Sequence, residues 1–303
     1  MKEIVVISGK GGTGKTSLAA SFAALADTAV IADCDVDASD LHLLLSPRIR
    51  QHAKFKSGRE AIIRSDDCLA CGACRTECRF RAVRPVRRNG RVSAFVIDPF
   101  SCEGCGVCVR LCPAQAIDFP ERICGEWFVS DTRFGPMVHA QLEIGAENSG
   151  KLVSIVRKEA HKIAEEIGNP WIIIDGPPGI ACPVIASITG ASLAVIVIEP
   201  TLSGLHDMER VLALTEHFGI PTMVCINKWE LNPKITSQIE KSVRSSNAFL
   251  AGRIRYDRAV TDAQISGTTV VEYGGPASRD IRRIWQELEK KLQNENVSTV
   301  MQV

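Results

Sequence analysis

The sequence predicts an α/β protein built on a doubly wound parallel sheet, into which a small cysteine-rich α+β module is inserted. Five short apolar, β-branched runs predict buried parallel strands: residues 2–8, 29–32, 171–174, 193–198 and 221–226. Eight of the twelve cysteines lie in one stretch, from Cys68 to Cys112. We therefore expect residues 1–56 and 123–303 to form the α/β domain and residues 57–122 to form the insert.

Composition and charge are ordinary for a globular protein. The 303 residues are 45% hydrophobic and 23% charged, and the formal net charge of +1 gives no argument for binding to nucleic acid. No apolar run approaches the roughly 18–20 residues that a membrane-spanning helix needs. Met1 leads directly into a strand-like segment without the features of a signal peptide. We expect a cytoplasmic protein.

The segment 278–293 predicts an amphipathic helix. Its apolar residues fall on one helical face: Ile281, Ile284, Trp285, Leu288 and Leu292. The opposite face mixes acidic and basic residues, whereas a helix that lies on a membrane surface has a uniformly basic polar face. We therefore expect this helix to cover the sheet, without membrane contact.

A glycine-rich loop follows the first predicted strand and precedes a predicted helix at residues 17–26. Its sequence is Gly9-Lys10-Gly11-Gly12-Thr13-Gly14-Lys15-Thr16. Glycines let backbone N–H groups close around phosphates, and the N-terminus of the following helix faces the anion. Lys15 supplies positive charge, and the Thr16 hydroxyl can ligate Mg²⁺. The spacing predicts a phosphate-binding loop.

Acidic residues follow two of the predicted strands. Asp35 and Asp37 come after the second strand, and Asp175 ends the third and is followed by Gly176-Pro177-Pro178-Gly179. Carboxylates at strand ends beside a phosphate-binding loop can hold the water of Mg²⁺ or orient an attacking water. For two neighbouring acids, Asp33 and Asp40, a role as helix caps is the alternative.

The cysteine-rich segment contains two copies of one spacing, C-x-x-C-x-x-C-x-x-x-C. In this pattern three close thiolates bind one [4Fe–4S] cluster, and the fourth cysteine of each run binds the other cluster. The first ligand set is therefore Cys68, Cys71, Cys74 and Cys112, and the second is Cys102, Cys105, Cys108 and Cys78. Arg79 follows the fourth cysteine of the first copy, where the second copy has Pro113. Zinc bound by the same thiolates is the alternative.

Lys10, placed immediately before the paired glycines, gives the loop the sequence KGGTGKT. This resembles the deviant Walker A signature of MinD, the nitrogenase iron protein, Mrp and partition ATPases. Together with the insert, it resembles the branch of the MinD/Mrp superfamily that contains a ferredoxin-like domain with two [4Fe–4S] clusters. The resemblance implies ATP and Mg²⁺ as ligands. It also implies an ATP-dependent dimer, either with itself or with a related ATPase, in which Lys10 reaches the partner's phosphates.

The resemblance also assigns roles to individual residues. It makes Lys10, Lys15, Asp35, Asp37 and Asp175 the catalytic set, with Asp35 in switch I and Asp37 positioning water. Asp175 reaches Mg²⁺ through water, and Gly179 of switch II contacts the γ-phosphate. Asn227 and Tyr256 contact adenine. The implied nucleotide-binding set is Gly9, Lys10, Gly11, Gly12, Thr13, Gly14, Lys15, Thr16, Ser17, Gly179, Asn227 and Tyr256.

Cys182 lies seven residues after Asp175. In the nitrogenase iron protein, a cysteine at this spacing binds the cluster that two subunits share. That site needs a second cysteine from each subunit, and its equivalent here falls near Ala146. We therefore expect Cys182 to be either a redox residue or a small packed side chain, which is the usual role of a free cysteine.

Six arginines lie close together in the insert without an intervening acid: Arg79, Arg81, Arg84, Arg87, Arg88 and Arg91. They can form a solvated face that offsets the negative charge of the clusters. They can also form a docking surface for an acidic redox partner, because charge steers encounter. No aromatic stacking pattern accompanies them, so we do not expect nucleic acid binding.

These features lead to three hypotheses for function. The first is ATP-gated electron transfer, in which ATP-dependent dimerisation controls delivery of electrons through the two clusters to a partner. The second is an iron–sulfur assembly or carrier ATPase similar to Mrp. The third is a spatial organiser similar to MinD, in which the clusters are structural.

Overall fold

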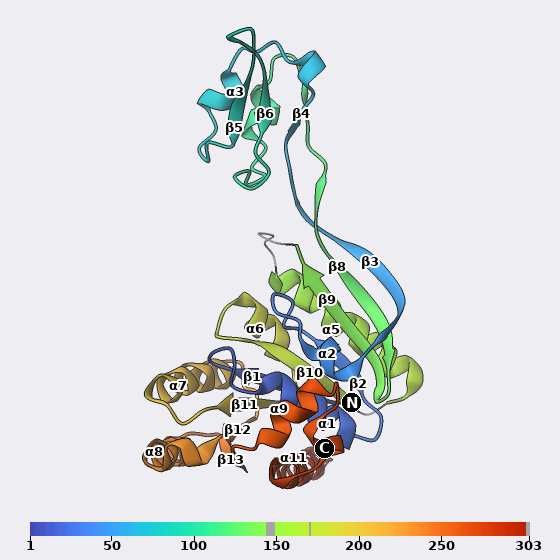
Figure 1. Ribbon diagram of the computed structural model, residues 1–303, viewed down its shortest axis with the longest axis vertical. Coiled ribbons are helices and arrows are strands. Elements are labelled where there is room, and N and C mark those ends of the chain that lie inside the picture. The colour runs from blue at the N-terminus through green and yellow to red at the C-terminus, as the bar shows by residue number, and fades with distance from the viewer. Residues whose placement is uncertain (144–148, 170, 301–303) are drawn as a thin grey trace. The chain divides into compact units, whose positions relative to one another are not determined.

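The computed structural model describes residues 1–143, 149–169 and 171–300 (Figure 1). The chain divides into two compact units. Among the described residues, unit 1 comprises residues 1–53, 126–142 and 149–300, and unit 2 comprises residues 54–125 together with Glu143. The boundary between the units falls inside two long strands, β3 (Arg48–Arg59) and β8 (Glu121–Thr132).

A sheet of nine strands runs through unit 1, in the order β13-β12-β11-β1-β10-β2-β9-β8-β3. Neighbouring strands from β13 to β9 pair in parallel. These are β13 (Phe249–Ile254), β12 (Thr222–Asn227), β11 (Leu193–Ile198), β1 (Lys2–Ser8), β10 (Trp171–Pro178), β2 (Val30–Asp33) and β9 (Gly135–Leu142). The predicted parallel α/β sheet is confirmed.

Helices cover both faces of this sheet (Figure 1). On one face, α1 (Lys15–Leu25) and α11 (Pro276–Val300) pack against alternate residues of β1 and β11. Short helices α2 (Leu41–Leu45), α9 (Arg258–Ile265) and α10 (Val270–Tyr273) lie beside α1 or α11. The opposite face carries α5 (Ser149–Ile167), α6 (Cys182–Ile188), α7 (Leu202–His217) and α8 (Pro233–Arg244).

The apolar face of α11 is buried in the core, as the sequence predicts. Ile281, Trp285 and Leu288 pack with residues of α1, and the Trp285 ring lies 5.3 Å from Phe22 and 5.2 Å from Trp171. Within the residues that the structure describes, no helix combines the length and apolar character that a membrane span requires.

Unit 2 contains two small antiparallel sheets. Strand β4 (Ile62–Ile63) pairs with β7 (Ile117–Asp118), and β5 (Val83–Arg88) pairs with β6 (Arg91–Ile97). Two short helices, α3 (Ala73–Thr76) and α4 (Val107–Leu111), pack together, and a 3₁₀ turn covers Ser65–Asp67. The core is small and is formed by Ala61, Cys74, Val83, Phe95 and Ile117.

The two cysteine runs of unit 2 have the same backbone conformation. Three positions of each copy adopt a positive φ, and the angles match: 53° at Ala70 and 60° at Gly104, 81° at Gly72 and 70° at Gly106, 54° at Arg81 and 50° at Gln115. In each copy, the second of these three positions is a glycine that precedes a short helix carrying the third cysteine. The sequence repeat is therefore also a structural repeat.

Candidate functional site

The glycine-rich loop joins β1 to α1, whose first residue is Lys15. At two of its positions glycine is required, because other segments approach the backbone too closely to leave room for a side chain. A Cβ on Gly9 would lie 2.3 Å from the Cβ of Asp207 in α7, and one on Gly14 would lie 2.6 Å from Nδ2 of Asn227. Gly14 also has a φ of 95°, which side chains rarely adopt. The loop is therefore held between the end of β12 and the N-terminal half of α7.

Lys15 is buried, with 6% of its surface exposed, and two carboxylates surround its ammonium group. Nζ donates to Asp35 Oδ2 at 3.1 Å and lies 3.7 Å from Asp175 Oδ1. Burial by itself lowers the pKa of Lys15, but the charges of Asp175 and then Asp35 outweigh it, so the pKa is raised. Lys15 is therefore a fixed positive charge at the carboxyl edge of the sheet.

Asp175 is fully buried without the hydrogen bonds that such a group normally has. Neither of its carboxylate oxygens, nor the hydroxyl of Thr13, has a hydrogen-bond partner among the described residues. Burial raises the pKa of Asp175, although the neighbouring Lys15 opposes the rise. Buried oxygens without partners are costly, and a hydrated Mg²⁺ and a phosphate would satisfy them. The residues present therefore fit a Mg²⁺-nucleotide.

Asp33 organises the loop that carries Asp35. Its carboxylate accepts from the backbone N–H of Asp35 at 3.1 Å and from the Ser39 hydroxyl at 2.7 Å. Burial raises the pKa of Asp33 well above its usual value. The charge of Asp175, which stands beside Asp33 in the register of β10 and β2, adds to the rise. Asp40 precedes α2, but its side chain makes no capping hydrogen bond. The alternative that these two acids cap helices is therefore wrong.

A solvent-open cleft of about 500 Å³ lies beside the glycine-rich loop. It brings together most of the predicted loop residues and Asp35: Gly11, Gly12, Gly14, Lys15, Thr16, Ser17 and Asp35. Leu43 of α2 and Gln264 of α9 also line it, and Gln264 Nε2 donates to the Ser17 hydroxyl at 2.8 Å. Sequence reasoning missed both residues because each reaches the loop from a distant segment without any motif.

Eight predicted residues do not line this cleft: Gly9, Lys10, Thr13, Asp37, Asp175, Gly179, Asn227 and Tyr256. Asn227 Nδ2 donates to the Thr13 carbonyl at 2.8 Å, so this amide ties β12 to the loop. Tyr256 is 62% exposed, and its backbone N–H donates to Glu230 at 2.8 Å. Partial burial, followed by the charge of Asp35, raises the pKa of Asp37.

Lys10 points toward the end of β11. Its Nζ lies 3.9 Å from Glu199 Oε2, while the other oxygen of Glu199 accepts from Lys228 Nζ at 2.6 Å. Lys10 also lies outside the residues that line the cleft. Among the described residues of this chain, Lys15 is therefore the only lysine or arginine that lines the cleft.

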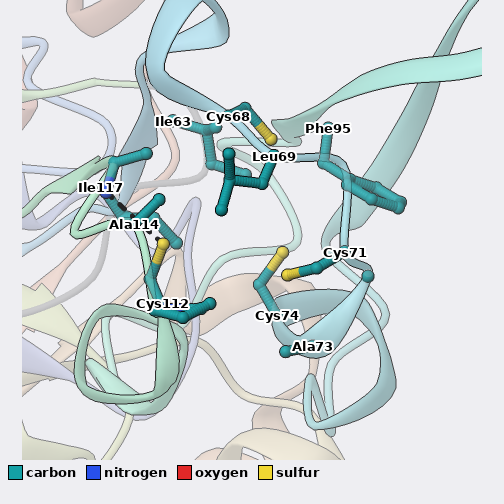
Figure 2. Close-up of a pocket in the computed structure, with 13 residues that line it drawn as sticks. Ile63, Cys68, Leu69, Cys71, Ala73, Cys74, Phe95, Cys112, Ala114 and Ile117 are labelled. Atoms are coloured by element: carbon teal, nitrogen blue, oxygen red, sulfur yellow. Dashed lines mark hydrogen bonds between the residues drawn. The ribbon is translucent and has the colours of Figure 1, made fainter.

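The first predicted ligand set surrounds one hollow in unit 2. Cys68, Cys71, Cys74 and Cys112 line it, together with apolar residues that include Leu69 and Phe95 (Figure 2). Burial raises the pKa of the Cys74 thiol, and the other three cysteines add to the rise. The free space inside this hollow is about 20 Å³. The fold therefore brings Cys112, from the second run, to the three cysteines of the first.

The structure brings together three of the four cysteines of the second predicted ligand set, Cys102, Cys105 and Cys108. Burial raises the pKa of the Cys108 thiol, and neighbouring Cys102 and Cys105 add to the rise. The fourth cysteine of each run accepts the same backbone hydrogen bond, from Ala82 N to Cys78 Sγ and from Ala116 N to Cys112 Sγ, each at 3.4 Å. As the side chains stand, the described residues contain no preassembled group of three or more His, Cys, Asp or Glu that could hold a metal ion.

The remaining cysteines are not gathered at either place. Cys182 is exposed at the start of α6, and Ala146, the equivalent of the second bridging cysteine, lies outside the described residues. Cys34, Cys124 and Cys225 are buried. The Cys124 thiol donates to the Ser57 carbonyl at 3.1 Å.

Comparisons with known proteins agree with this geometry. The CobQ/CobB/MinD/ParA nucleotide-binding domain matches residues 4–270. An uncharacterized protein of Methanocaldococcus jannaschii, MJ0578, is 35% identical over 76% of this chain and 79% of its own length. A second one, MJ0579, is 24% identical over 95% of this chain and 96% of its own length.

Solved structures show the same fold at low sequence identity. The septum site-determining protein MinD of Pyrococcus horikoshii, complexed with Mg-ADP, has a TM-score of 0.56 at 15% identity and covers 95% of this chain and 96% of its own. MinD in the MinC:MinD cell division complex of Aquifex aeolicus has a TM-score of 0.56 at 18% identity, covering 96% of both chains. These similarities support the fold.

We predict that Lys15→Ala weakens binding of Mg-ADP by roughly 10–100-fold, because a charge-assisted hydrogen bond to phosphate contributes about 1.5–3 kcal/mol. Titration with a fluorescent ADP analogue measures the loss. Lys234→Ala, which removes an exposed lysine of α8, is the matched control and should bind normally. An unchanged affinity in a folded Lys15→Ala protein would show that the cleft is not the nucleotide site.

Proposed function

The chain belongs to the CobQ/CobB/MinD/ParA nucleotide-binding domain family, and we propose that it is an ATP-driven switch that acts as a dimer. The observation that carries this proposal is the cleft at the phosphate-binding loop, lined by Lys15 and Asp35. Asp175 lies 3.7 Å from Lys15, and its oxygens accept no hydrogen bond from the described residues. When bound, Mg²⁺ would supply positive charge to the phosphates. In this proposal Lys15 would orient the phosphates, Thr16 and Asp175 would hold the ion and its water, and Asp35 and Asp37 are the residues assigned to position an attacking water.

The dimer is proposed because, among the described residues, Lys15 is the only lysine or arginine that lines the cleft. Lys15 already shares its charge with two carboxylates, and Lys10 is directed to Glu199. Charge that develops during phosphoryl transfer needs further stabilisation, which such enzymes commonly receive from a second positive side chain. Lys10 of a second copy, or of a related ATPase, is the group proposed for this role. Solved relatives named as MinD and ParA-family ATPases support a nucleotide-driven cycle of this kind.

We predict that Lys10→Ala still binds ATP but no longer dimerises with it, because Lys10 does not line the cleft of its own chain. Sedimentation velocity with a non-hydrolysable ATP analogue and with ADP measures the effect. Lys228→Ala removes the other lysine that contacts Glu199 and serves as the control. Normal ATP-dependent dimers of Lys10→Ala would contradict the proposed role of this residue.

We further propose that unit 2 is a ferredoxin-like module with two [4Fe–4S] clusters. Its support is the convergence of Cys68, Cys71, Cys74 and Cys112 on one apolar hollow, a set that includes one cysteine from the other run. The paired N–H···S hydrogen bonds at Cys78 and Cys112 fit thiolates that bind iron, since such bonds tune clusters. Iron–sulfur clusters, when bound, supply one-electron redox chemistry.

We predict that protein purified without oxygen contains about eight iron and eight sulfide per chain, following the two-cluster pattern. Cys78→Ser should disturb the cluster held by Cys102, Cys105 and Cys108, and leave the one nearer in sequence intact. Electron paramagnetic resonance of the reduced protein separates the two signals. Stoichiometric zinc without iron in the native protein, or loss of the Cys68–Cys74 signal in Cys78→Ser, would contradict the assignment.

The comparisons support a MinD-like ATP-driven switch better than electron transfer, because the named relatives are cell division or ParA-type ATPases. In that use the clusters serve as structural parts of unit 2. Electron transfer gated by nucleotide is a second candidate, and it rests on the cysteine arrangement alone. Chain order favours it: the loop with Asp35 and Asp37 precedes the first strand that enters unit 2, and β10 with Asp175 follows the return from unit 2.

A further inference from the structure

The hairpin β5–β6 of unit 2 presents positive charge at a rigid tip. Asn89 and Gly90 form its turn, with φ of 51° and 78°. Two consecutive positive φ values are characteristic of the tight type I′ turn, whose twist matches that of the strands. The turn places Arg88 and Arg91 directly opposite each other in the antiparallel register. The two side chains therefore leave neighbouring backbone positions at the end of the hairpin.

Most of these charges have no ion-pair partner among the described residues. Like charges directly opposite each other destabilise a pair of strands. Arg84 forms an ion pair with Asp98, but in the described part of the chain no carboxylate lies within 4 Å of Arg87, Arg88 or Arg91. Arg87 donates only to the Gly90 carbonyl, at 3.2 Å. An acidic partner protein would relieve the repulsion between Arg88 and Arg91, which the hairpin holds opposite each other.

Positive charge continues to the turn that carries Cys78, and the internal repeat provides a comparison. After Cys78 the chain reads Arg79-Phe80-Arg81, whereas after Cys112 it reads Pro113-Ala114-Gln115. The two turns share their φ angles and their N–H···S hydrogen bonds. The backbone therefore does not require these arginines, since a neutral sequence forms the same turn in the second copy. Neither Arg79 nor Arg81 has an ion-pair partner among the described residues.

Exposed apolar side chains accompany the arginines. Phe80 lies between Arg79 and Arg81 and is 40% exposed, and Val96, opposite Arg84, is 48% exposed. Arginine together with aromatic and apolar side chains is typical of protein–protein interfaces. The six residues of β5, which lead from the Cys78 turn to the hairpin tip, span roughly 20 Å. That length fits within one interface of standard size.

We propose that these residues form a docking surface for an acidic electron-carrier protein. The surface consists of Arg79, Phe80, Arg81, Arg87, Arg88, Arg91 and Val96. The inference rests on the proposed iron–sulfur module, because it places the carrier beside Cys78 and the cluster assigned to it. In the exchange, the carrier loses one electron and the iron–sulfur group gains one, and no bond is made or broken. Positive charge speeds the encounter with the acidic partner.

The test is the binding of an acidic flavodoxin to the full-length protein, measured by microscale thermophoresis at low and high ionic strength. Arg88→Gln/Arg91→Gln removes two charges from the hairpin tip. Arg75→Gln/Arg110→Gln removes two exposed arginines that have no ion pair in the described residues, from α3 and α4, and is the matched control. The hairpin variant should bind about tenfold more weakly and lose most of its salt dependence. The control should bind within about twofold of the unchanged protein.

Equal binding by the two variants would overturn the proposal, and so would tighter binding of a single-stranded RNA than of the flavodoxin. Iron and sulfide are measured in every sample. Normal iron content with equal binding contradicts the docking surface alone, whereas protein without iron contradicts the proposed clusters. Because all four substituted arginines are exposed, both variants should fold, and their thermal unfolding midpoints verify this.

Discussion

The ion pairs between Lys15 and the carboxylates of Asp35 and Asp175 organise the carboxyl edge of the sheet. One buried ammonium group lies among acids from the ends of two neighbouring strands, β2 and β10, and Asp33 is a third acid in register with Asp175. Removing Lys15 would leave buried negative charges without a counter-ion, which is strongly destabilising. The glycine-rich loop, the loop after β2 and the end of β10 are therefore held together by the same positive charge that a phosphate would use.

This arrangement is the basis for proposing that one chain alone is an incomplete site. The charge of Lys15 is already offset, and Lys10 is directed away from the cleft toward Glu199. A nucleotide must therefore bring its own cation, and a transition state with more negative charge needs a further one. The proposed dimer supplies that charge from a second chain. Unit 2 is organised differently. Its two cysteine runs share one backbone conformation, and cysteines from both runs line one hollow.

Sequence alone predicts the parts of the site that lie in contiguous motifs. The glycines, Lys15, Asp35 and Asp175 could be identified because spacing and strand ends determine where they meet. Asp33 was assigned only a capping alternative, since its role depends on Ser39 and on the register with Asp175. Gln264 reaches the loop from a distant segment, so no local pattern marks it. Strand β3 was also missed, because its sequence RIRQHAKFKSGR is polar and largely exposed, without an apolar run.

The central claim is that a second chain completes the ATPase site, and the most direct measurement is ATP hydrolysis per chain as a function of protein concentration. Activity measured with saturating Mg-ATP should rise with concentration and level off when the dimer is fully formed. The concentration at the midpoint should match the dimer dissociation constant obtained by sedimentation. Hydrolysis per chain that stays constant across the range in which the protein remains a monomer would contradict the account.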